Sequence, residues 1–166
     1  MSLTLDLQIA SESKQYPEQK LIESWITAAL TYMNISKQTT ITLRIVDETE
    51  IQELNKNYRD KNKHTNVLAF PSMLPEILNT DNHLGDILAC APVIEKEALE
   101  QHKNLTAHWA HMVVHSTLHL LGYDHQIESQ AHHMEHCEQE ILKILGFPNP
   151  YLSDFNPNFN SDNEEQ

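Results

Sequence analysis

The segment HSTLHLLGYDH, residues 115–125, constrains this 166-residue chain more than any other stretch. His115 and His119 are four residues apart, so on a helix they lie one above the other on the same face. Gly122 can adopt the left-handed conformation that ends a helix, and the chain can then return His125 towards the same point. Three imidazoles that converge in this way form a zinc site with one open coordination position, which is the catalytic form of such a site.

The spacing of the three histidines is that of the metzincin peptidases, in which a glutamate follows the first histidine as the general base. Here that position is Ser116. A hydroxyl of ordinary acidity cannot take a proton from zinc-bound water at neutral pH. The segment thus keeps the metal geometry of a peptidase without its base, and it indicates a metal-activated water that acts on a different substrate.

The chain holds 11 histidines, so a single pair at helical spacing carries little information. His111 with His115 and His132 with His136 are further pairs of this kind. His111 and His108 lie on the same predicted helical stripe, where they can be decoys, groups that hydrogen-bond the ligands, or a wall of the cleft. A third histidine after a helix-ending glycine is what favours metal binding. We therefore predict one zinc ion held by three ligands, His115, His119 and His125.

The composition describes an acidic protein with one local basic segment. Eleven basic residues stand against 24 acidic ones, a net charge of -13, and such a balance by itself argues against a nucleic-acid partner. The segment NKNYRDKNKHTN, residues 55–66, differs from the rest because its cations are gathered there: Lys56, Arg59, Lys61 and Lys63, with His64. On charge pattern alone, this segment is equally well a solvated loop.

Length and composition predict one domain over residues 1–152. A hydrophobic content of 40% and a charged content of 21% fit a soluble globular protein with a substantial core. Residues 153–166 are acidic and without periodicity, which predicts a disordered tail. The chain shows no apolar run of membrane-spanning length, no secretory signal and no cysteine framework. A cytoplasmic protein without a membrane partner is therefore expected.

Hydrophobic periodicity predicts strands over residues 3–9, 39–46, 67–70 and 84–90, and helices over 17–33, 47–58, 92–102, 106–121 and 128–145. Asp47 and Glu50 have the spacing of a capping box, residues 72–83 read as a loop, and the apolar strand 84–90 predicts burial on both faces. Strands come early and helices cluster late. The predicted class is α+β, with a small mixed sheet of about four strands, about five helices, and the metal site on a core helix and the loop after it.

Four segments together resemble the YbeY family of bacterial endoribonucleases and ribosomal RNA maturation factors. They are HSTLHLLGYDH, the preceding AHWAHMVV, the segment YRDKNKHTNVLAFP and the later LGDI. The resemblance covers the chain to about Tyr151. Two departures are visible: Ser116 stands where the family usually has Gly, and Ala69 where it commonly has Ser, which removes one hydroxyl from the cleft.

The resemblance implies a metal-dependent, single-strand-specific endoribonuclease that acts in small-subunit rRNA processing, ribosome maturation and quality control. It places the zinc ligands at His115, His119 and His125 and a functional basic residue at Arg59. The expected partners are single-stranded RNA, rRNA precursors, and the small ribosomal subunit or its proteins.

The remaining site predictions follow from the chemistry of a phosphodiester. Arg59 is expected to hold the phosphate as charge develops on it, and Lys61, Lys63 and His64 are expected to hold the strand. Asp124 either orients a ligand imidazole or the bound water, or is a plain turn residue. Asp86 either hydrogen-bonds the ligands from outside or is a structural partner inside the sheet.

Two other functions are compatible with the same residues. One is a zinc-dependent hydrolase of another bond, such as a peptide or amide, and Ser116 counts against it. The other is a non-catalytic, zinc-bearing ribosome-binding factor, against which the open coordination position counts. The sequence leaves the metal open, because three imidazoles also accept nickel, copper or iron. It also leaves open whether water or the RNA 2'-hydroxyl attacks.

Overall fold

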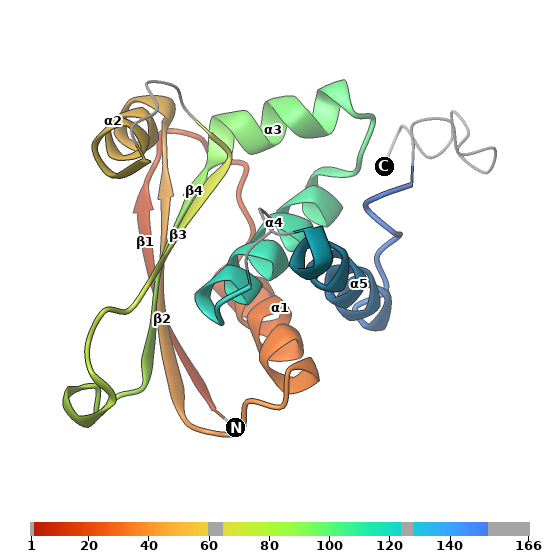
Figure 1. The fold of residues 1–166 in the computed structure, drawn as a ribbon. Coiled ribbons are helices and arrows are strands. Elements are labelled where there is room, and N and C mark those ends of the chain that lie inside the picture. The colour runs from red at the N-terminus through yellow and green to blue at the C-terminus, as the bar shows by residue number, and fades with distance from the viewer. Residues whose placement is uncertain (1, 60–64, 124–127, 153–166) are drawn as a thin grey trace.

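The computed structural model describes residues 2–59, 65–123 and 128–152 (Figure 1). In these ranges the chain forms four strands, five α-helices and one 3-10 turn. In chain order they are β1 (Leu3–Ala10), α1 (Gln19–Tyr32), β2 (Thr39–Val46), α2 (Glu48–Arg59), β3 (Val67–Pro71), η1 (Glu76–Leu78), β4 (His83–Cys90), α3 (Ala91–Glu100), α4 (Leu105–Leu120) and α5 (Glu128–Ile144). The predicted α+β class and the number of elements are confirmed.

The four strands form one mixed sheet in the order β1-β2-β4-β3. The neighbours β1 and β2, and β2 and β4, are parallel, whereas β3 runs antiparallel to β4 at the edge. Parallel neighbours cannot be joined by a hairpin, so α1 provides the crossover from β1 to β2. Pro71 ends the edge strand β3, a position that tolerates the missing backbone N–H.

Helix α4 lies at the centre of the molecule. It packs against α1, α3 and α5 and against strands β3 and β4 (Figure 1). Its predicted place in the core is confirmed, since Trp109, Val113 and Leu118 are at most 1% exposed. A helix buried on nearly all sides carries polar residues into the interior, so its histidines have to find partners within the protein.

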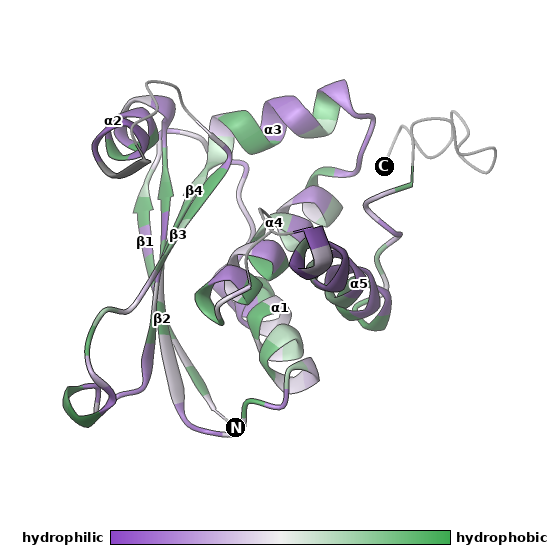
Figure 2. Cartoon of the chain, viewed as in Figure 1, coloured by the Kyte–Doolittle hydropathy of each residue, from purple (hydrophilic) through white to green (hydrophobic). Residues whose placement is uncertain are grey.

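The other face of the sheet is covered at one end by α2. Ile51 of α2 packs with Val46, Leu88 and Cys90 in a second, smaller core. Burial on both faces, predicted for the whole of β4, therefore holds from Ile87 onwards, where α2 lies over the strand. Figure 2 shows this part of β4 as hydrophobic, while much of α2 and α5 is hydrophilic.

Two local predictions differ from the structure. Instead of forming a capping box, Asp47 accepts hydrogen bonds from the Ser11 hydroxyl and, at 3.0 Å, from the Glu12 N–H. Glu50 pairs with Arg44, whose Nε lies 2.7 Å from its carboxylate. Both carboxylates find partners outside the helix that periodicity along the chain does not reveal. The predicted loop over 72–83 contains the 3-10 turn η1.

Candidate metal centre and active site

Both ends of α4 are capped. At its start, the side chain of Asn104 accepts a hydrogen bond of 3.1 Å from the Ala107 N–H. At its end, Gly122 has a φ of +101°, the left-handed conformation predicted for it. The N–H groups of Gly122 and Tyr123 donate to the carbonyls of His119 and Leu118. The chain thus turns at Gly122, three residues after His119. The predicted third ligand His125 and its neighbour Asp124 lie outside the described residues.

His115 and His119 bring two ring nitrogens to one point. Their Nε2 atoms are 3.1 Å apart, and the rings meet nearly edge to face at 81°. Two nitrogens at this distance can share either a proton or a metal ion. A tetrahedral zinc ion with bonds of about 2.0–2.1 Å separates two ligand nitrogens by about 3.3 Å. The two side chains therefore fit two positions of one metal site.

A buried carboxylate from α5 holds the far side of the His115 ring. Oε2 of Glu138 lies 3.2 Å from Nδ1 of His115, and the glutamate is 1% exposed. An ionised carboxylate can only accept a hydrogen bond, so Nδ1 carries a proton, and in the neutral ring the lone pair is then on Nε2. Histidines that bind metals usually have their second nitrogen engaged in this way.

Two further donors complete the environment of Glu138. Nε2 of His111 lies 2.5 Å from Oε1, and the Tyr151 hydroxyl donates to the same oxygen at 2.8 Å. A buried carboxylate is tolerated when hydrogen-bond donors satisfy both of its oxygens. Residues 111, 115, 138 and 151 thus form one hydrogen-bonded group, here called the Glu138 network.

The pKa values in the Glu138 network agree with an ionised Glu138 surrounded by hydrogen-bond donors. Burial alone would raise the pKa of Glu138, but hydrogen bonds with His111 and His115 outweigh it and lower the pKa to about 2. Burial lowers the pKa of His111, which favours its neutral form at pH 7. Burial, together with the nearby Glu138 charge, raises the pKa of Tyr151, so its hydroxyl stays protonated and can donate.

Part of the same network could also hold a metal ion directly. Among the described residues, His111, His115 and Glu138 have potential ligand atoms that all lie within 4.8 Å of one another. The atoms in question are already joined by the two histidine–carboxylate hydrogen bonds. An ion here would have to replace those bonds, whereas an ion between His115 and His119 leaves them intact.

The histidine stripe of α4 continues away from the candidate site. Successive ring centroids of His108, His111, His115 and His119 are 6.5, 6.2 and 4.6 Å apart. Nε2 of His108 lies 3.0 Å from Glu97 of α3. Of the roles left open from sequence, hydrogen bonding near the ligands therefore applies to His111, while His108 is part of a separate pair with Glu97.

Ser116 has no access to the histidine pair. Its side chain is fully buried, and its hydroxyl donates to the carbonyl oxygen of Met112 at 2.8 Å. This contact supports the sequence argument that the site lacks the base of a peptidase, because the hydroxyl is committed to the helix backbone.

Asp86 lies on the face of the sheet that is turned away from α4 and its histidine pair. Its neighbour Gly85 faces α4, since a Cβ there would lie 2.8 Å from Cδ2 of Leu120. Successive residues of a strand point to opposite faces, so Asp86 points away, where it is exposed and lies 3.1 Å from Nε2 of His83. The structure favours the alternative of a structural partner in the sheet.

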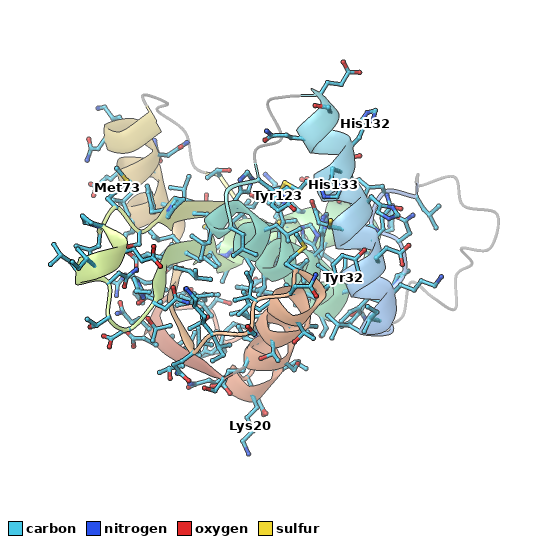
Figure 3. The ribbon with its side chains drawn as sticks, turned by 60° about the horizontal axis from the view of Figure 1, so that its bottom comes forward. Lys20, Tyr32, Met73, Tyr123, His132 and His133 are labelled. Atoms are coloured by element: carbon cyan, nitrogen blue, oxygen red, sulfur yellow. The ribbon has the colours of Figure 1, made fainter. Side chains whose placement is uncertain are left out.

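Of the residues predicted to contact RNA, one lies within the described ranges, at the end of α2. Arg59 is the last residue of that helix, whereas Lys61, Lys63 and His64 lie outside the described residues. In Figure 3, α2 and the first turns of α5, with His132, rise on the same side of the molecule, with Tyr123 between them and Lys20 on the opposite side. The end of α4 and the helix that bears Arg59 thus belong to one side of the protein.

Glu138 and Tyr151 are residues of the site that were not predicted from the sequence. A signal for Glu138 was present, because it falls on the apolar stripe of α5 with the buried residues Met134, Cys137, Ile141 and Leu142. A lone carboxylate on a buried stripe requires a buried partner. Tyr151 follows the last helix in a segment without periodicity, and no comparable signal marks it.

The mixed sheet, the buried helix α4 and its histidine pair define an α+β domain with a candidate hydrolase site. The model of the family "Endoribonuclease YbeY" matches residues 6–146, and the chain belongs to this family. The solution structure of TM1509 from Thermotoga maritima is similar, with a TM-score of 0.53 and 25% sequence identity over 84% of this chain and 91% of that chain. Family membership supports an endoribonuclease of rRNA processing, with RNA as its substrate.

Proposed function

We propose that this protein is a metal-dependent, single-strand-specific endoribonuclease that acts in small-subunit rRNA processing, ribosome maturation and quality control. The family supports RNA cleavage. The observation that carries the metal dependence is the pair of Nε2 atoms of His115 and His119, 3.1 Å apart on a core helix. With His125, these side chains would hold one zinc ion.

Within this proposal, the residues of the chain hold and orient the metal ion, and none of them is assigned as the general base. A zinc ion supplies a Lewis acid for a phosphoryl oxygen and lowers the pKa of water. Helix α4 is fixed by packing on several sides, which keeps the spacing of His115 and His119 constant. Ser116 takes no part, because its hydroxyl is bound to Met112. Asp124 is proposed to orient a ligand imidazole or the water.

The charges around α2 suggest from which end RNA approaches. The lining of a cavity at the N-terminal end of this helix has four acidic side chains, Glu12, Asp47, Glu48 and Glu95, against one basic side chain, Lys14. Phosphates are repelled there and attracted by Lys56 and Arg59 at the other end. We assign Arg59 to the phosphate of the substrate, and Lys61, Lys63 and His64 to the rest of the strand.

The proposed setting is the cytoplasm, with rRNA precursors and the small ribosomal subunit or its proteins as partners. None of the described helices combines the length and the apolar character needed to cross a bilayer.

Replacement of one ligand tests the proposal. His119→Ala should reduce zinc-dependent cleavage of a single-stranded RNA by more than about a hundredfold, since even the loss of a group that only supports a ligand costs 10- to 100-fold. His136→Ala removes an exposed histidine of α5 and is the matched control. A duplex of the same sequence should be cut much more slowly than the single strand.

Two results would refute the assignment. Equal cleavage by the wild type and a folded His119→Ala variant would show that the reaction takes place elsewhere. Normal rRNA maturation in cells that have only this variant would favour a non-catalytic ribosome-binding factor.

A further inference from the structure

We propose that Glu138 is the positioning residue of the metal site. It fixes the imidazole of His115 in the tautomer that has its proton on Nδ1, so that Nε2 offers a lone pair beside Nε2 of His119. His111 and Tyr151 hold the carboxylate in place for this purpose. The inference rests on the proposed metal site of His115 and His119 and adds a residue of α5 to it.

The contact between two helices brings His115 and Glu138 together. His115 belongs to α4 and Glu138 to α5, and these helices pack against each other. Oε2 of Glu138 lies 3.2 Å from Nδ1 of His115. Next to Glu138 on α5, Cys137 and Ile141 are buried at 2% and 0% exposure. Helix α5 therefore places the carboxylate beside the His115 ring, and the packing of the two helices sets the orientation of the ring.

The other carboxylate oxygen of Glu138 is held by two hydrogen-bond donors. Oε1 of Glu138 is 2.5 Å from Nε2 of His111 and accepts the Tyr151 hydroxyl at 2.8 Å. The Tyr151 oxygen and Nε2 of His111 are themselves 3.3 Å apart. Two donors converge on Oε1 from different elements, so rotation of the carboxylate would break both bonds. Oε2 is thereby kept for His115.

The two edges of the His115 ring have different partners. Nδ1 faces Glu138 and Nε2 faces His119, at 3.2 and 3.1 Å. A direct metal site at Glu138 would take the Nδ1 edge and displace donors from a carboxylate that is 1% exposed. The positioning role uses both edges as they stand, and it explains why a charged group is retained in the core at all.

The isosteric variant Glu138→Gln is the test. The amide keeps the shape of the side chain but offers one acceptor oxygen and one donating NH2 group. The three donors of the network can no longer all be accepted, so a histidine facing the amide nitrogen has to change its tautomer. Glu140→Gln on the same helix removes the same charge and serves as the matched control.

Two measurements do not depend on cleavage. Imidazole 15N NMR of the metal-free protein should show His115 protonated on Nδ1 in the wild type and in Glu140→Gln, and a changed tautomer population in Glu138→Gln. Competition with a chromophoric chelator should show zinc bound about 10- to 100-fold more weakly by Glu138→Gln. Tyr151→Phe, which removes one donor to Oε1, should weaken zinc binding by a smaller factor, about two- to fivefold.

The same titrations distinguish positioning from direct ligation. With Glu138 in the positioning role, His119→Ala loses tight zinc binding and Glu138→Gln retains a weakened site. If His111, His115 and Glu138 are the ligands, His119→Ala binds zinc as the wild type does and Glu138→Gln does not bind it. That result would overturn the proposal.

The outcome is independent of the proposed function. Weaker zinc binding in Glu138→Gln together with a wild type that cleaves no RNA would refute the nuclease and keep the positioning role. The opposite case is a wild type that cleaves RNA with zinc and a folded Glu138→Gln variant that binds zinc within about twofold of the wild type. This result would keep the nuclease and refute the positioning role. Should Glu138→Gln fail to fold, the wild type decides by itself, because a neutral His115 protonated on Nε2 in the metal-free protein contradicts the proposal.

Discussion

The hydroxyl of Ser116 donates a hydrogen bond of 2.8 Å to the carbonyl oxygen of Met112, four residues earlier on α4. The next residue, Thr117, binds the carbonyl of Val113 in the same way, also at 2.8 Å. Both hydroxyls are fully buried and engaged with the helix backbone. The hydroxyl in the position of a peptidase base is thus committed to the helix backbone.

Replacement of Ser116 by Ala should leave RNA cleavage unchanged within about twofold. The lost hydrogen bond costs little, since Ala has the higher helix propensity and the Met112 carbonyl is part of the helix, and the free energy of unfolding should change by less than about 1 kcal/mol. The kcat/KM on single-stranded RNA and urea unfolding measure the two effects. A tenfold fall in kcat/KM in a folded Ser116→Ala protein would contradict this account.

Gly85 is the point at which strand β4 approaches both its neighbour and α4. A Cβ at this position would lie 2.2 Å from the carbonyl oxygen of Phe70, and the residue has a φ of +148°. Gly85→Ala should therefore reduce the free energy of unfolding by more than about 3 kcal/mol, because strand and helix must both move. Gly146→Ala, which also has a positive φ but meets no atom within 4 Å, should cost about 1 kcal/mol. Urea unfolding of both variants compares them, and equal losses would show that the close approach does not matter.

The pair of Glu97 and His108 should make stability depend on pH. Burial alone would raise the pKa of Glu97, but hydrogen bonds from His108 and Asn66 outweigh it and lower the pKa below its ordinary value of 4.5. A carboxylate with a lowered pKa in the folded state stabilises the protein at higher pH, and this contribution is lost as the pH falls through the folded-state value. Glu97→Gln should cost about 1 kcal/mol near pH 7, with a smaller difference from the wild type near pH 3.

The control for that experiment is Glu100→Gln, in which a more exposed carboxylate of the same helix is replaced. Urea unfolding of metal-free protein at several pH values measures the difference. A cost of Glu97→Gln that is the same at both ends of the pH range would show that the charge of Glu97 contributes nothing.

Arg59 at the end of α2 should act on the substrate and not on the fold. A charge-assisted contact with phosphate contributes about 1.5–3 kcal/mol, so Arg59→Ala should lower kcat/KM on single-stranded RNA by about 10- to 150-fold. Lys20→Ala removes a cation on the opposite side of the molecule (Figure 3) and should have no effect. If both variants lose activity equally, the loss reflects net charge alone. Zinc affinity should be unchanged in Arg59→Ala.

The elements of this fold could be predicted because each has a local signal. Strand β2 was predicted with its observed bounds, since Ile41, Leu43 and Ile45 alternate with polar residues along one buried face. The end of α4 followed from Gly122, whose left-handed conformation is confirmed. In such places the residues nearest in sequence decide the structure, and periodicity or a single special residue is sufficient to predict it.

The contacts between elements could not be read from the same patterns. Glu138 reaches His115 across 23 residues and His111 across 27, and only the packing of α5 on α4 brings them together. The sequence leaves two roles open for Asp86, near the metal ligands or as a structural partner in the sheet. Only the way in which β4 packs on α4 shows that Asp86 points away from α4, where it pairs with His83. Spacing along the chain located the candidate ligands, whereas their supporting partners depend on how the helices dock.

The residues of the Glu138 network lie far apart in the order of synthesis. The ribosome makes the histidine pair of α4 first, Glu138 afterwards, and Tyr151 a further 13 residues later. A nascent chain that has already folded its sheet and central helix therefore still lacks the groups that hold His115 in its working orientation. The support of His115 is therefore complete only when nearly all of the domain has been synthesised.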